Sequence, residues 1–249
     1  MTLRKKLTLP TMLFLLIELV LYGLILTTSG QLLVYSSFIS IAICFAHVLF
    51  HYKNCDKFIL TGLFFTVCAD FCLVICSPIQ QLWGMCFFLI TQTLYAVKLH
   101  REQKSKPLLY ARISLILLAV AVTVLVLGEK TDALALVSLC YYANLIMNII
   151  VAFTKFRQAK LFPIALALFL LCDTVIGLQV ACGAYLPIAE GSLLHNIIFM
   201  DFNLSWFFYL PSQVLISLSG KAKRPATPGS DEPGASYFSS LQPMAFFQI

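Results

Sequence analysis

The chain has 249 residues, of which 60 % are hydrophobic and 11 % are charged, and its formal net charge is +6. Soluble globular domains carry about 25 % charged residues, so a soluble protein of this composition would lack the polar side chains to cover its surface. The composition therefore excludes an ordinary soluble enzyme and predicts a protein whose surface faces lipid.

Eight long apolar runs follow one another along the chain, at about residues 9–29, 32–50, 58–76, 81–97, 108–128, 133–154, 161–182 and 195–218. Each run suits a helix that crosses a hydrocarbon core about 30 Å thick. Strands do not suit them, because open sheet edges leave backbone groups unpaired in lipid and the alternation of barrel strands is missing. Basic residues before the first run resemble a signal peptide, but no small-residue cleavage site is clear, so we expect a retained first helix.

The basic residues separate by side if all eight runs cross the membrane. One side holds only Lys130 of the seventeen basic residues. The other side holds Arg4, Lys5, Lys6, Lys53, Lys57, Lys98, Arg101, Lys104, Lys106, Arg112, Lys155, Arg157, Lys160, Lys221, Lys223 and Arg224. Because cytoplasmic loops are enriched in Lys and Arg, the pattern predicts one bundle of eight transmembrane helices with both termini cytoplasmic. It also explains the positive charge without a nucleic-acid partner.

Residues 1–219 are expected to form the transmembrane domain, and residues 220–249, rich in Pro, Gly and Ser, a mostly disordered cytoplasmic tail. The nine cysteines lie mostly in apolar runs, without the spacing of a zinc or haem site. Cys68, Cys72 and Cys76 share one helix face and are interpreted as small packing residues. No metal or other cofactor is expected, since the sequence shows no Gly-rich phosphate loop and no metal-spaced cluster.

Four acidic residues interrupt the predicted spans, where a charge costs about 2.5–3.5 kcal/mol at the helix centre. They are Glu18, Asp70, Asp173 and Asp201. In the predicted topology no Lys or Arg lies deep enough to pair with them. They are therefore candidates for a functional cavity, or for carboxylic acids kept neutral by burial. Glu18 fits a structural carboxyl group equally well.

Counting residues along the helices places Asp70 roughly 20 Å and Asp173 roughly 18 Å from the cytoplasmic boundary. Asp201 lies roughly 9 Å below the outer boundary, at a similar level. Polar side chains continue from this layer towards the cytoplasmic face at Gln92, Tyr95, Asn144, Asn148, Tyr209 and Gln213. The pattern predicts a polar pocket among the helices.

Other interpretations of these residues stay open. Asp201 also fits a position near the interface, where its cost is small. Asn144 and Asn148 share a helix face and fit interhelical hydrogen bonds. Tyr141 and Tyr142 fit simple packing near mid-span.

The third and seventh predicted helices resemble each other when Asp70 and Asp173 are aligned. Residues 64–73 then match residues 167–176 in their apolar pattern. Both helices run outward and lie four spans apart. This suggests a weak parallel repeat of four plus four helices.

Four short motifs, in this order, resemble those of the YhhN-like membrane proteins. Residues 69–73 (Ala-Asp-Phe-Cys-Leu) are similar to Gly-Asp-x-x-Leu, and residues 92–95 (Gln-Thr-Leu-Tyr) take the place of His-x-x-Tyr. Residues 168–173 are similar to Leu-Phe-x-x-Ser-Asp, and residues 209–216 to Tyr-x-x-x-Gln-x-Leu-Ile. The resemblance covers roughly residues 10–218. Ala69, Cys172 and Gln92 replace the family's glycine, serine and histidine, and the last change removes a titratable group.

The resemblance implies a lysoplasmalogenase, which hydrolyses the vinyl ether of a lysoplasmalogen to a fatty aldehyde and a glycerophospho-base. This chemistry needs an acid that protonates carbon and a partner carboxylate that stabilises the oxocarbenium ion or activates water. Asp70 and Asp173 are expected to divide these catalytic roles as a coupled pair. The substrate-binding residues expected around them are Gln92, Tyr95, Tyr142, Asn144, Asp201, Tyr209 and Gln213.

Two other functions remain open from the sequence. Membrane aspartates and the faint repeat also fit a proton-coupled transporter of a small molecule or lipid. Gln92 in the histidine position also fits a non-catalytic lipid-binding protein. In each case the expected partners are membrane lipids and a lysophospholipid or other amphiphile. The location is an integral membrane one, the cell membrane if bacterial and an organelle membrane if eukaryotic.

Overall fold

The computed structural model describes residues 8–103, 105–155, 161–184, 192, 195–196, 200 and 202–220. Within these residues the protein is all α-helical. Seven of its described helices are long and apolar enough to cross a membrane. The protein is therefore a multi-pass membrane protein.

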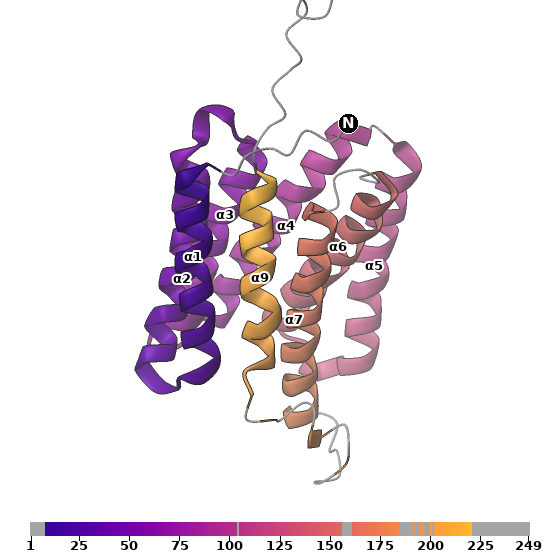
Figure 1. The fold of residues 1–249 in the computed structure, drawn as a ribbon. Helices are drawn as coiled ribbons and strands as arrows, with labels where there is room; N and C mark the ends of the chain where they lie inside the picture. The colour runs from indigo at the N-terminus through magenta and orange to yellow at the C-terminus, as the bar shows by residue number, and fades with distance from the viewer. Residues whose placement is uncertain are drawn as a thin grey trace, which may run out of the picture.

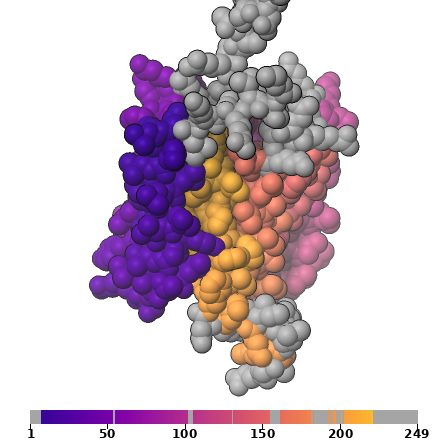
Figure 2. All heavy atoms as spheres, viewed as in Figure 1, coloured from indigo at the N-terminus to yellow at the C-terminus, as the bar shows by residue number. Residues whose placement is uncertain are grey.

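The long helices are α1 (Leu9–Thr27), α2 (Gly30–Phe50), α3 (Lys57–Asp70), α4 (Gln81–Gln103), α5 (Lys106–Leu127), α6 (Ala133–Lys155), α7 (Leu161–Ala184) and α9 (Leu204–Ser219). A π-helical segment, Phe71–Ile75, continues α3, and short 3-10 helices cover Tyr52–Asn54 and Gly128–Lys130. The long helices run side by side as one bundle (Figure 1). Helix α9 lies between α1 and α7, and its side chains form a continuous surface there (Figure 2).

The first four long helices and the last four pack in the same order. Contacts of α1 with α2, α2 with α3 and α3 with α4 recur as α5 with α6, α6 with α7 and α7 with α9. Helix α4 packs on α6, and α2 packs on α9, which joins the two sets. The structure therefore has the arrangement that a four-plus-four repeat gives.

Most apolar runs predict their helices to within a few residues, but two boundaries differ. The third run passes into the π-helical segment directly after Asp70. The last helix begins at Leu204, with Asn203 at its N-cap, and not near residue 195. With 16 residues, α9 is shorter than the seven helices of spanning length. The eighth crossing and the side of each terminus stay predictions, and the expected tail, residues 220–249, lies outside the described residues except for Gly220.

Pro211 opens the hydrogen-bond ladder of α9. It has no N–H to donate to the carbonyl of Phe207, one turn earlier. Tyr22 Oη of α1 donates to this Phe207 carbonyl at 3.1 Å. Because of the proline, the Phe207 carbonyl is available to accept the hydrogen bond from Tyr22, which joins α1 to α9.

Gly62 lets α3 and α4 approach closely. A Cβ atom at this position would lie 2.8 Å from Tyr95 Cζ, so a larger residue would displace the ring. The Gly62 carbonyl also accepts a hydrogen bond from Thr91 Oγ1 of α4 at 3.1 Å. This close contact keeps Tyr95 fully buried.

Candidate functional site

The two predicted catalytic carboxyl groups each accept a hydrogen bond from a tyrosine inside the bundle. Asp70, the last residue of α3, is 3 % exposed and accepts a hydrogen bond from Tyr209 Oη of α9 at 2.7 Å. Asp173 of α7 is partly buried and accepts a hydrogen bond from Tyr141 Oη of α6. The two donor tyrosines contact the same two phenylalanine rings, so both acids lie at one aromatic cluster. Four helices thus converge on one pair of acids.

Two phenylalanines hold the tyrosine rings in place. Phe88 of α4 contacts Tyr141 and Tyr209, with ring centroids 5.8 and 6.4 Å apart. Phe169 of α7 contacts the same two rings at 6.4 and 5.3 Å. All four rings are buried. This aromatic cluster fixes the hydroxyl donors and leaves few other polar partners for the carboxyl pair.

The backbone widens where Asp70 ends α3. The next residues form a π-helical turn, closed by a hydrogen bond from the Cys76 N–H to the Phe71 carbonyl at 3.0 Å. Single π turns inside helices are frequent at functional sites. No Gly or Pro lies in residues 71–75 to signal the turn, so periodicity alone misses it.

One face of α6 carries a polar stripe of Tyr141, Asn144 and Asn148, spaced three and four residues apart and all buried. Asn148 Nδ2 donates to the Gln92 carbonyl at 2.8 Å and to Gln92 Oε1 at 2.9 Å. Asn144 Nδ2 donates to Thr93 Oγ1 at 3.3 Å. Both asparagines therefore bind α6 to α4, as the interhelical interpretation expects.

Several buried polar atoms near this stripe have no hydrogen-bond partner among the described residues. They include Gln92 Nε2, Tyr95 Oη, Asn148 Oδ1 and Gln213 Oε1, and each of these side chains is 0 % exposed. Gln92 lies one turn beyond Phe88, and Gln213 one turn beyond Tyr209. A buried polar group without a hydrogen-bond partner costs about 1–3 kcal/mol of stability. These four atoms are therefore candidates for contacts with a bound ligand, which would supply the missing partners.

A scan against family models matches the YhhN family over residues 31–220, which is about three quarters of the chain. The chain belongs to the YhhN family. The matched range holds both aspartates and every helix from α2 to α9, while α1 lies before it. No curated protein and no solved structure matches the chain significantly.

Not every residue predicted for the site of this YhhN protein contacts the carboxyl pair. Tyr142 Oη hydrogen-bonds to Thr174 Oγ1 at 2.8 Å, so it links α6 to α7 beside the pair. Its neighbour Tyr141 makes the contact with Asp173. Tyr141 shares a helix face with Asn144 and Asn148 by its spacing, and Tyr142 does not. The spacing in the sequence therefore identifies Tyr141 as the residue on the polar face. Asp201 lies outside the described residues.

Glu18 belongs to a separate polar group between α1 and α2. Its carboxylate accepts hydrogen bonds from Ser40 Oγ and, at 3.6 Å, from Cys44 Sγ. It is 3 % exposed. These contacts match the structural interpretation of Glu18, although Cys44 is near enough to Asp70 to interact with it electrostatically.

Two basic residues, Arg112 and Lys98, lie within helices and make polar contacts there. Helix α5 begins at Lys106 with Pro107 in its first turn, so Arg112 lies inside the helix and donates to Asn144 Oδ1. Helix α4 runs on to Gln103, so Lys98 also lies inside, paired with Asp56 Oδ2 at 2.5 Å. Polar residues extend both helices beyond their apolar runs. Neither cation pairs with Asp70 or Asp173. Among the described residues no three His, Cys, Asp or Glu side chains gather as metal ligands.

Proposed function

We propose that this YhhN-family protein is a lysoplasmalogenase-like hydrolase that cleaves the vinyl ether of a lysophospholipid inside its helix bundle. One observation carries the proposal. Asp70 and Asp173 come from helices far apart in the chain, and each is held by a tyrosine hydroxyl whose ring packs against Phe88 and Phe169. No lysine or arginine in the described part of the chain forms an ion pair with either. The family resemblance supports the same activity.

The pair has the chemistry that this hydrolysis requires. The protonated carboxyl group of one aspartate adds its proton to the outer vinyl carbon, and the carbon bonded to oxygen becomes an oxocarbenium ion. The other aspartate, as carboxylate, takes a proton from water while the water oxygen bonds to that cationic carbon. The resulting hemiacetal breaks its bond to the glycerol oxygen, which receives the hydroxyl proton. One water is consumed, and the products are a fatty aldehyde and a glycerophospho-base.

The surrounding groups suit the supporting roles. A low-dielectric interior favours one shared proton on two neighbouring carboxyl groups, so the pair acts as one titrating unit. Tyr141 and Tyr209 hold the carboxylate oxygens. The unpaired polar atoms of Gln92, Tyr95 and Gln213 are proposed to bind water or the glycerol oxygens. Asn144, on the same face of α6 as Tyr141, is proposed to orient the substrate.

The test replaces each acid by its amide. Asp70→Asn and Asp173→Asn are each expected to abolish aldehyde release from lysoplasmalogen by the purified protein. Glu129→Gln is the control, because Glu129 is an exposed carboxyl group in the 3-10 helix after α5. Size-exclusion chromatography checks folding of all three variants. Normal turnover in either aspartate variant would reject the catalytic pair.

We also propose eight crossings, with α9 as the last, both termini on the cytoplasmic side, and residues 220–249 as a tail. The separation of the basic residues supports this topology. A reporter enzyme active only in the cytoplasm, fused after residue 249 and after Lys130, tests it. The first fusion is expected to be active and the second inactive. An inactive C-terminal fusion contradicts the proposal.

A carrier is the second candidate, favoured by the repeated packing order of the two helix sets. Repeats of this kind are common in secondary transporters. Uptake of a lysophospholipid into proteoliposomes without any aldehyde formation would support the carrier. Aldehyde formation that depends on both aspartates supports the hydrolase.

A further inference from the structure

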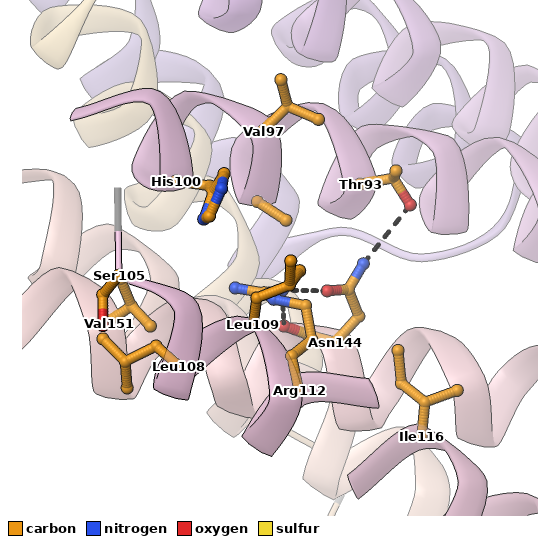
Figure 3. Close-up of a pocket in the computed structure, with 11 residues that line it drawn as sticks. Thr93, Val97, His100, Ser105, Leu108, Leu109, Arg112, Ile116, Asn144 and Val151 are labelled. Atoms are coloured by element: carbon orange, nitrogen blue, oxygen red, sulfur yellow. Dashed lines mark hydrogen bonds between the residues drawn. The ribbon is translucent and has the colours of Figure 1, made fainter. Parts of the chain in front are cut away.

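A groove runs between α4 and α5, and α6 forms its floor. Both walls pack on α6, but they have no comparably extensive contact with each other. The groove has a volume of about 290 Å³ and opens on the outside of the bundle. Thr93, Val97 and His100 face it from α4, where they are exposed (Figure 3). In a membrane this opening faces lipid.

Arg112 is the fixed charge in this groove. It projects from α5 across to α6, where one guanidinium nitrogen donates to Asn144 Oδ1 and, at 3.4 Å, to the Asn144 carbonyl (Figure 3). No carboxylate among the described residues forms an ion pair with it. A guanidinium has five N–H donors in a planar fork, so donors remain for a second partner.

The groove combines this cation with apolar walls. Leu108, Leu109 and Ile116 of α5 line it together with Val97 of α4. An uncompensated guanidinium is costly at a lipid-facing position, and an anion removes most of that cost. Phosphate oxygens match the guanidinium fork, and alkyl chains match the leucine and isoleucine side chains. The lining therefore suits an amphiphile with a phosphate group.

We propose that the groove binds the phosphodiester group of the lysophospholipid substrate, with Arg112 as its principal contact. The inference rests on the proposed function, for which it supplies the headgroup site. Ser105 and His100 stand at the end of the groove where α4 finishes and α5 begins, and they offer further polar contacts. Lipid phosphates lie at the membrane interface, and the basic residues Lys98 and Lys106 lie at this end of the bundle.

The groove and the carboxyl pair are connected through α6. Asn144, which accepts from Arg112, lies one turn from Tyr141 on the same face, about 4.5 Å along the helix axis. Tyr141 donates to Asp173. In a lysoplasmalogen, the glycerol backbone separates the phosphate from the vinyl ether. The phosphate site and the carboxyl pair therefore share one face of α6, and we place the vinyl ether at the pair.

The experiment measures binding of two ligands that the protein cannot hydrolyse. One is a saturated ether lysophospholipid, 1-O-hexadecyl-glycerophosphocholine, and the other is 1-O-hexadecylglycerol, which has the same chain without phosphate. Arg112→Gln in the full-length protein is expected to weaken phospholipid binding roughly tenfold or more, since charge-assisted hydrogen bonds are lost. Binding of the alkylglycerol should not change. Arg101→Gln is the matched control, because Arg101 lies over the Phe58 ring, 5.3 Å from its centroid and outside the groove.

A second variant keeps the test decisive if Arg112→Gln does not fold. Ser105→Asp leaves Arg112 in place and adds a carboxylate to the groove, so it should weaken phospholipid binding and spare the alkylglycerol. Equal affinity of the wild-type protein for both ligands, or unchanged phospholipid binding in both groove variants, overturns the proposal. Competition by a diacyl phosphatidylcholine at equal strength also overturns it, since the groove then holds bilayer lipid.

The result separates the headgroup site from the hydrolase. Neither ligand has a vinyl ether, so the binding data do not depend on hydrolysis. Phosphate-dependent binding that needs Arg112 upholds the groove even if the aspartate variants still release aldehyde. Loss of aldehyde release in those variants upholds the hydrolase even if the groove variants bind normally.

Discussion

The two halves of the bundle, α1–α4 and α5–α9, place interior polar groups at matching positions and enclose them differently. Buried residues on α2 have the same spacing as buried residues on α6: Ser37, Ser40, Cys44 and His47 against Tyr141, Asn144, Asn148 and Val151. Glu18 of α1 contacts Ser40, and Arg112 of α5 contacts Asn144 at the matching position. One half thus presents an acid where the other presents a base.

The two halves differ in how their first helices, α1 and α5, pack against neighbouring helices. Helix α1 packs on both α2 and α9, with Tyr22 bound to the Phe207 carbonyl, and Glu18 is 3 % exposed. Helix α5 packs mainly on α6 and fully buries only Thr123. A second covering helix therefore makes a polar position structural, and its absence leaves the position open to a ligand.

Charge reversal should break this comparison most strongly. Glu18→Lys places an unpaired cation in the enclosed half, which should cost several kcal/mol and prevent recovery of folded protein. Arg112→Glu, at the open groove, should still yield folded protein but lose phospholipid binding. Fluorescence-detected size-exclusion chromatography measures both. Equal yields of the two variants would show that enclosure does not distinguish the positions.

The two tyrosine donors both come from the second half, but Tyr209 donates to Asp70 of the first half and Tyr141 to Asp173 of the second. Removing each hydroxyl therefore tests whether the two acids are equally important. Tyr209→Phe should lower aldehyde release about 10–100-fold, because Asp70 is almost fully buried and loses its hydroxyl donor. Tyr141→Phe should have a smaller effect, since Asp173 is partly exposed and can take water as a substitute partner. Steady-state kinetics of both variants decide the order. The reverse order would assign the more critical acid to α7.

A bulkier side chain in the groove should enclose the polar position of the second half, as the polar position of the first half is already enclosed. Leu109→Trp adds bulk between α4 and α5, so KM for the lysophospholipid should rise about tenfold while kcat changes little. Leu125→Trp is the control, because Leu125 is 82 % exposed on the same helix and outside the groove. An unchanged KM in Leu109→Trp would remove the groove from the substrate path.

The smallest effect is expected from the bond that ties α1 to α9. Tyr22→Phe removes the donor to the Phe207 carbonyl and should lower the free energy of unfolding by about 0.5–1.5 kcal/mol. Thermal unfolding in detergent measures the change, with Tyr35→Phe as the control at an exposed position of α2. A loss of aldehyde release at normal stability would instead place α1 in the catalytic site.

The sequence predicts the long apolar helices, because apolar length determines which segments can cross a bilayer, while the pairing of Asp70 and Asp173 stays a prediction. Tyr142 is chosen where Tyr141 makes the contact, although the spacing of Tyr141 to Asn144 and Asn148 indicates the polar face of α6. The sequence also misses the π-helical turn at Phe71 and the position of Arg112. A helix continues past the end of an apolar run where neighbouring side chains form hydrogen bonds or ion pairs with its polar residues. The apolar run itself does not show where this happens.

The free carbonyl beside Pro211 also sets an order of assembly. Its donor, Tyr22, lies 185 residues earlier in the chain, so this bond cannot form until α9 has been synthesised. The same delay applies to the hydroxyl of Tyr209, which donates to Asp70. Until α9 has been made, Asp70 at the end of α3 therefore lacks its hydroxyl donor. Helix α9 completes both connections.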